Sequence, residues 1–229
     1  MHVLKGIAIA ALCWAAALPG WARADAVAAE AVTAHEVVRG TTTRVMDVVR
    51  EAPTYVDEDP ERYYAAIQAI LDPVIDFRGF ARGVMGPYAS SERYRSLDAA
   101  GREQLKTQLD RFTEVIRLGL VRTYSKGLLA FGGSRIEVSK PATDEAAASR
   151  ASVQQLIFSE QAEPYVVMYQ MGRDRKTGTW LLRNMIIESV NLGEIYRNQF
   201  QAAARKYDGD LDSVIDNWDA GEAESSLET

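Results

Sequence analysis

The sequence has very few side chains that act as metal ligands or strong nucleophiles. Of its 229 residues, one is Cys (Cys13) and two are His (His2 and His35). Cys13 and His2 lie in an N-terminal segment that we expect to be removed, so a Cys/His zinc site is excluded. A Ser-His-Asp triad would have to use His35, which we expect to be solvated beside Glu36. We therefore expect no catalytic residue, no metal site and no cofactor.

Positive charge is also scarce. The chain has 26 Lys and Arg against 32 Asp and Glu, which gives a net charge of −6. Residues 208–229 contain eight acids and no base. Nucleic-acid binding needs a basic surface, so this class of function is excluded. No internal stretch has the roughly 20 uninterrupted apolar residues of a membrane-spanning helix.

Residues 1–24 have the pattern of a secretory signal. Lys5 is followed by an apolar run over residues 6–18, and Ala22-Arg23-Ala24 supplies the small residues that a signal peptidase reads. We expect cleavage after Ala24, not lipid modification of Cys13, because Leu12 stands where a small residue is required. The exported chain then has no Cys, so disulfides cannot stabilise it.

Three aspartates near the C-terminus alternate like the first ligands of a calcium loop. However, Ser213 stands at the sixth position in place of Gly, and Asp219 stands at the twelfth in place of Glu. We therefore expect Asp210 to cap a short final helix instead.

The period of the apolar residues predicts helices first, strands next and helices last. Helices are expected over residues 26–50, 60–71, 77–85, 96–131, 192–207 and 211–218. Asp59-Pro60 and Asp76 are typical helix starts, and Ser96 is the expected cap of the longest helix. The C-terminal half of that helix has two apolar stripes, one of them containing Leu118, so we expect contacts on both sides.

Four strands are expected after Gly132-Gly133. They are Ser134–Ser139, Ala148–Ser159, Pro164–Arg173 and Thr179–Glu188, with Gly178 at positive φ in the last hairpin turn. The pattern predicts an α+β fold, a curved four-stranded antiparallel sheet with helices packed on one face. We expect one domain over residues 25–220 and an acidic disordered tail over residues 221–229.

Two of these strands are apolar in both directions. Residues 165–169 and 180–187 do not alternate as a strand with one wet face does. They are either central strands covered on both sides or the wall of an apolar cavity, and the pattern does not separate the two.

The charge of residues 76–126 is positive, with ten basic and six acidic side chains. This is either a solvated helix surface with salt bridges or a cationic rim that receives a phosphate or an acidic partner. Farther along the chain, Arg197 is expected to span two layers by pairing with a carboxylate or a carbonyl.

Several segments resemble one family in their order and spacing. They are Asp76-Phe77 through Gly86-Pro87-Tyr88, Arg122 to Leu129 (RTYSKGLL), Trp180 leading to Asn191-Leu192, and Tyr196 to Phe200 (YRNQF). Over about residues 30–220 the chain resembles MlaC, the toluene-tolerance or ABC-transporter auxiliary component family of periplasmic phospholipid-binding proteins. It departs from the family pattern at Ala89, Asn184 and Ser189, where Trp, Asp and Gly are usual.

The resemblance implies a non-enzymatic periplasmic phospholipid carrier. Such a carrier would hold acyl chains in an apolar cavity between helices and sheet and leave the head group outside. Its implied partners are an outer-membrane lipoprotein–porin complex and an inner-membrane ABC transporter complex, and we expect a monomer.

We predict which side chains contact the lipid. The cavity lining is expected to comprise Phe77, Phe80, Val84, Met85, Ile116, Leu120, Tyr124, Val167, Tyr169, Met171, Trp180, Leu182 and Ile186. Arg78, Arg82 and Arg122 are the candidates for head-group binding or docking. The alternative is a small isomerase or dehydratase, with Asp76 as base and Tyr124 or Tyr169 as acid.

Overall fold

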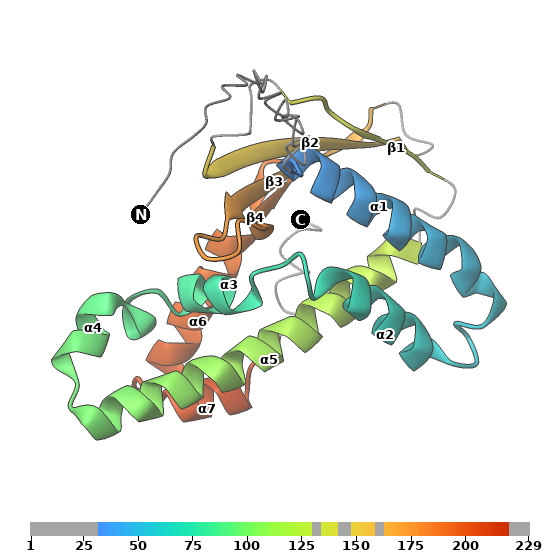
Figure 1. Cartoon of the computed structure of the whole chain (residues 1–229). Helices are drawn as coiled ribbons and strands as arrows, with labels where there is room; N and C mark the ends of the chain where they lie inside the picture. Colours follow the sequence, from blue (N-terminus) through green and yellow to red (C-terminus); the bar gives the residue numbers. More distant parts are fainter. Residues whose placement is uncertain (1–31, 130–133, 142–147, 159–162, 220–229) are drawn as a thin grey trace, which may run out of the picture. The chain divides into compact units, whose positions relative to one another are not determined.

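The strands follow one another along the chain between two groups of helices (Figure 1). The computed structural model describes residues 32–129, 134–141, 148–158 and 163–219. These residues belong to one unit that begins at Val32. The expected signal segment, its cleavage site and the tail at 221–229 lie outside the described residues.

The helices confirm most of the expected elements. They are α1 (Ala34–Glu51), α2 (Pro60–Leu71), α3 (Phe77–Met85), α4 (Ser91–Ser96), α5 (Ala99–Leu129), α6 (Leu192–Lys206) and α7 (Leu211–Asp216), with 3-10 turns η1 (Ala52–Thr54) and η2 (Gly86–Ala89). The carboxylates of Asp59, Asp76 and Asp210 accept the backbone N–H bonds that cap α2, α3 and α7. These helices therefore begin where their caps predicted.

Two helix starts were predicted wrongly. α1 begins at Ala34, because Thr33 and Glu36 form a reciprocal capping box, and residues 26–31 of the expected helix lie outside the described residues. Ser96 ends the short helix α4, which was not predicted, and Leu97 is extended. The cap of α5 is Asp98, whose Oδ1 accepts a bond from the Gly101 N–H at 2.8 Å.

The sheet has five antiparallel strands in the order β1-β2-β3-β4-β5. They are β1 (Arg135–Val138), β2 (Arg150–Phe158), β3 (Tyr165–Arg173), β4 (Trp180–Ile187) and β5 (Val190–Asn191). The first four confirm the expected strands, and Gly178 has the expected positive φ of 74°. β5 was missed because two residues are too short to show a period.

The connection from α2 to α3 is bonded to the sheet. Leu182 of β4 donates its N–H to the Val74 carbonyl at 2.8 Å and accepts from the Asp76 N–H at 3.0 Å. This pairing covers an edge of β4 that β5 does not reach. The start of α3 is therefore fixed to the sheet.

The helices lie on one side of the sheet, with α1 directly beneath it (Figure 1). One apolar cluster joins α3, α5, α6 and α7. A second joins α1, α2 and the C-terminal half of α5, and a third joins α1 to the sheet. His35 is buried at the start of α1, so the expectation of a solvated side chain is wrong.

The two faces of α5 are not equally covered. Its main stripe is buried as expected, with Leu105, Phe112 and Ile116 in the first cluster. Val121, from the second stripe, is buried in the second cluster. Leu118 is 47% exposed, so the expected contact on both sides is wrong at this residue.

A tight turn between β4 and β5 generates a stability prediction. Glu188 and Ser189 have φ values of 48° and 73°, where side chains are disfavoured and Gly is not. We expect Ser189→Gly to raise the free energy of unfolding by about 0.5–1 kcal/mol in urea titrations. Ser189→Ala keeps a β-carbon at this φ and should give no such gain. If the Ser189→Gly variant were less stable than the wild type, the backbone at residue 189 would not be strained.

Candidate functional site

A cavity of about 400 Å³ lies between the sheet and the helices. Its walls come from α1, the connection from α2 to α3, α3, the C-terminal half of α5 and the inner face of β1–β4. The lining side chains are mostly aliphatic and aromatic. The strand pattern allowed either central strands covered on both sides or the wall of an apolar cavity, and the structure shows the cavity. Such a site suits an apolar ligand.

Eight of the predicted lining residues lie on this cavity. They are Phe77, Phe80, Leu120, Tyr124, Val167, Tyr169, Met171 and Leu182. They come from α3, α5, β3 and β4, which the fold brings together around the hollow. Their contact with a lipid stays a prediction.

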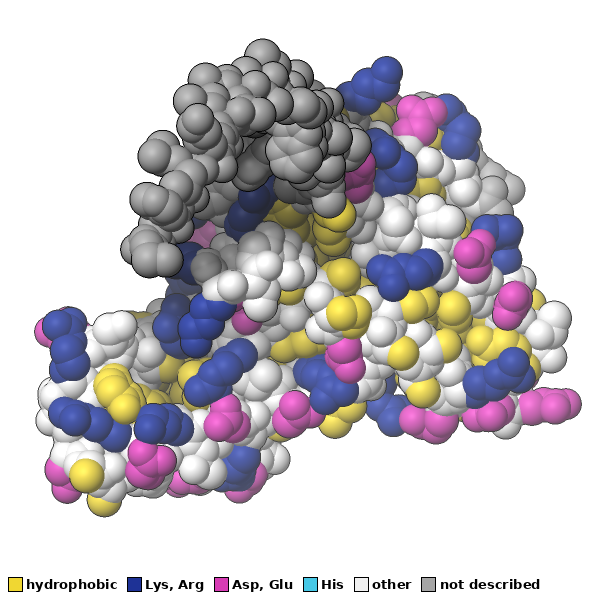
Figure 2. Space-filling model, viewed as in Figure 1, with side chains coloured by type: hydrophobic (Ala, Val, Ile, Leu, Met, Phe, Trp, Pro, Cys, Tyr) yellow, Lys and Arg dark blue, Asp and Glu magenta, His cyan; other side chains and the backbone are white. Residues whose placement is uncertain are grey.

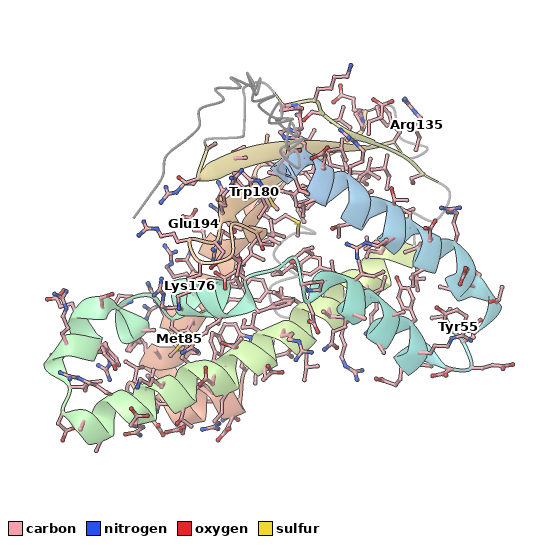
Figure 3. All side chains as sticks on the ribbon, in the orientation of Figure 1. Tyr55, Met85, Arg135, Lys176, Trp180 and Glu194 are labelled. Carbon is pink, nitrogen blue, oxygen red and sulfur yellow. The ribbon has the colours of Figure 1, made fainter. Side chains whose placement is uncertain are left out.

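Five predicted residues lie elsewhere. Val84, Met85 and Ile116 are buried in the cluster of α3, α5 and α6, because that face of α3 is turned toward those helices. Trp180 packs with α1 at the end of the sheet. Figure 3 shows this separation, with Trp180 beside the sheet and Met85 between α3 and α5.

Ile186 misses the cavity because of a bulge. Gln170 pairs with Asn184 and Met171 pairs with Leu182, so Arg183 is an extra residue in β4. The extra residue reverses the alternation beyond it, and Met185 and Ile187 line the cavity in place of Ile186. Nothing in the periodicity of the sequence reveals this shift.

Sequence reasoning missed one whole wall of the cavity. Val38, Thr41 and Val45 of α1 line it, and their spacing of three and four residues forms one apolar stripe along the helix. The spacing was a usable signal, but it did not tell whether the stripe faces a packed core or a hollow. Ile75 of the connection also lines the cavity and carried no periodic signal.

A chain of hydrogen bonds crosses the apolar wall. The Tyr169 hydroxyl donates to Gln155 Oε1 at 2.5 Å, and Gln155 Nε2 donates to Thr42 Oγ1 at 2.8 Å. Gln155 is only 3% exposed, so these bonds replace the water that its amide loses. Burial also raises the pKa of the Tyr169 hydroxyl, so this group stays protonated as a donor. The chain ties α1 to β2 and β3.

Asp76 and Arg183 form an ion pair beside the cavity. Asp76 also caps α3 by accepting the Gly79 N–H at 3.0 Å. A carboxylate with these two partners has a structural role and is not placed as a free base. Arg183 lines the cavity and was not among the expected cations.

The three predicted arginines lie outside the cavity lining. Arg78 forms an ion pair with Asp110, and Arg122 Nη2 lies 2.8 Å from Glu61 Oε2. Arg82 lines a separate hollow on the outer side of α3. For Arg78 and Arg122 the solvated surface with salt bridges is therefore the better description.

The described residues provide neither a metal site nor a membrane span. Among them, no three His, Cys, Asp or Glu side chains come close enough together to hold a metal ion. None of the helices in this part of the chain combines the length and the apolar character needed to cross a membrane.

Three comparisons with known proteins agree with this geometry. The model of the family described as MlaC protein matches residues 39–220. The toluene tolerance protein ttg2D of Pseudomonas putida is 31% identical over 192 residues, which cover 84% of this chain and 82% of that protein. A phospholipid-binding protein from Ralstonia solanacearum, solved with a phospholipid, matches with a TM-score of 0.63. That match covers 86% of this chain and all of the other at 16% identity, so it shows the fold.

The hydrogen-bond chain in the cavity wall generates a second stability prediction. Tyr169→Phe leaves buried Gln155 Oε1 without its donor, and we expect the free energy of unfolding to fall by about 1–2 kcal/mol. Adding Gln155→Leu removes the stranded oxygen, so the double variant should lose less than the sum of the two single losses. Tyr207→Phe, at a half-buried tyrosine whose hydroxyl has no partner among the described residues, is the control. Additive losses in urea titrations would contradict the coupling.

Proposed function

Because this chain belongs to the MlaC family, whose model matches residues 39–220, we propose that it carries phospholipid in the periplasm. The acyl chains occupy the apolar cavity, and the head group stays outside it. The observation that carries this proposal is the cavity itself, an apolar hollow of about 400 Å³ in the chain's own fold. A phospholipid is present in the solved Ralstonia solanacearum protein that shares this fold.

The energetics of a lipid in water favour direct transfer. Two acyl chains carry roughly 30 methylenes, and each gains about 0.8 kcal/mol on leaving water. A free lipid is therefore about 24 kcal/mol less stable in water than in hydrocarbon. A carrier cannot exchange such a molecule through bulk water at a useful rate. The cavity has to match a bilayer closely, and loading and unloading take place in docked complexes.

The proposed partners follow from family membership. An outer-membrane lipoprotein–porin complex stands at one end of the route, and an inner-membrane ABC transporter complex stands at the other. The carrier crosses between them as a monomer after its signal segment is cleaved behind Ala24. Its net negative charge favours docking to proteins over adsorption to anionic bilayers.

MlaC proteins are lipid-binding carriers and not enzymes. The alternative of a small isomerase or dehydratase is therefore rejected. It had cast Asp76 as the base, and this carboxylate is the cap of α3 and the ion-pair partner of Arg183.

The proposal predicts that blocking the cavity removes co-purifying phospholipid. Gly127 is the exposed residue among the described residues that line the cavity, and a β-carbon there meets no atom within 4 Å. Gly127→Trp is therefore expected to keep the fold, since Gly is disfavoured in a helix, while its ring narrows the hollow. We expect at least a fivefold drop in bound phospholipid by native mass spectrometry and lipid extraction. Gly40→Trp, at an open helical position outside the cavity, is the matched control.

Two aspartate substitutions in the cavity wall also test whether the cavity holds the lipid. Leu120→Asp with Leu182→Asp should abolish bound lipid, because ionised carboxylates cannot face acyl chains. Leu118→Asp, on the exposed side of the same helix, should leave the lipid content unchanged. Unchanged lipid in folded Gly127→Trp and double-aspartate proteins, with folding checked by circular dichroism, would overturn the proposal. A wild-type protein purified without phospholipid would overturn it as well.

A further inference from the structure

A second hollow lies on the outer side of α3. It is an open groove of about 550 Å³ formed by α3, η2, the start of α4 and one side of α6. Its lining includes two arginines, Arg82 and Arg197, together with Gln201 and small residues of α3 and η2. We call it the arginine groove.

The two faces of α3 serve the two hollows. Phe77 and Phe80 line the apolar cavity, whereas Gly79, Arg82 and Gly83 line the arginine groove. The spacing of three and four residues within each set puts its members on one side of the helix. Because Gly83 has no side chain and a β-carbon there would meet no atom within 4 Å, another molecule can approach the backbone of α3 closely at this residue.

The groove presents guanidinium groups that are available for binding. Arg197 Nε donates to the Gly83 carbonyl at 3.0 Å, which fixes the plane of the group. The expected pairing with a carbonyl is confirmed, and it joins α6 to α3. Its two terminal amino groups remain as donors. The Arg82 side chain is exposed, and its guanidinium group has no hydrogen-bond or ion-pair partner among the described residues. Two planar guanidinium groups, each able to donate parallel N–H bonds, suit carboxylates or phosphates.

Several arginines of α3 and α5 are neutralised by carboxylates. Arg78, Arg111, Arg117 and Arg122 each form an ion pair with at least one carboxylate. The lining of the arginine groove contains no Asp or Glu. Figure 2 shows dark blue side chains gathered over α3 and α4. The groove is therefore a local site for negative charge on a chain whose net charge is −6.

We propose that the arginine groove docks an acidic segment of a partner protein. The head group of a lipid in the cavity would have to cross α3 to reach Arg82, so the bound lipid is a poor occupant. An anionic bilayer is disfavoured by the net charge of the whole chain. A groove of this volume also exceeds the size of one small anion and suits an extended peptide. The proposal rests on the proposed carrier function in one respect: a lipid carrier has to dock to another protein to release its lipid.

Fluorescence anisotropy with a defined probe tests the groove. The probe is a fluorescein-labelled peptide of about 12 residues in which Glu and Asp alternate with Gly and Leu. It should bind the full-length protein at low salt and weaken on going from about 50 to about 300 mM NaCl. Arg82→Glu with Arg197→Glu should raise the dissociation constant at least tenfold. The same peptide with Gln and Asn in place of the acids should not bind.

Matched measurements make each outcome decisive. Arg39→Glu with Arg44→Glu changes the net charge equally on α1 and should leave peptide affinity within twofold. Equal weakening by both pairs would show that only bulk charge matters, and unchanged affinity in the groove variant would exclude the site. Two outcomes would overturn the protein partner in favour of another anion. One is competition by inorganic phosphate alone, and the other is preferential binding to phosphatidylglycerol vesicles through Arg82 and Arg197. Retained phospholipid in a folded groove variant separates this test from that of the cavity.

Discussion

The walls of the cavity have to be held apart, because the collapse of an apolar hollow of about 400 Å³ would otherwise lower the free energy of the protein. The 31 residues of α5 meet this constraint by belonging to two cores. At about 1.5 Å per residue the helix spans about 46 Å. Phe112 and Ile116 fix its first half against α3, α6 and α7, and Val121 fixes its second half against α1 and α2. Leu120 and Tyr124 can then face a space that no neighbouring helix fills.

The sheet side of the cavity is secured by polar bonds as well as by the packing of α1 against the sheet. The pairing of Leu182 with Val74 and Asp76 holds the start of α3, and the chain from Tyr169 through Gln155 holds α1. Both ties cross the boundary between helices and sheet, where filling with side chains would remove the hollow. Hydrogen bonds between buried groups are costly to break without water, so these bonds add to the apolar contacts that hold α1 on the sheet.

Most of the fold followed from local signals. Asp59, Asp76 and Asp210 marked helix starts, and Gly178 marked a turn, because each acts through its own backbone neighbourhood. Helical spacing placed Phe77, Phe80, Leu120 and Tyr124 on the cavity, but it did not separate them from Val84, Met85 and Ile116, which lie in the packed core. What failed depended on distant or irregular geometry. The bulge at Arg183 reversed a strand face, and the burial of His35 is set by tertiary packing. An apolar stripe looks the same whether it meets a core or a void, so α1 was not recognised as a wall.

Helix α3 is only nine residues long, and its backbone carries Phe77 and Phe80 on one face and Gly79, Arg82 and Gly83 on the other. The thickness of a single helix, about 10 Å, is therefore all that separates the apolar cavity from the arginine groove. A substitution that tilts or rotates α3 would disturb the lining of both at once.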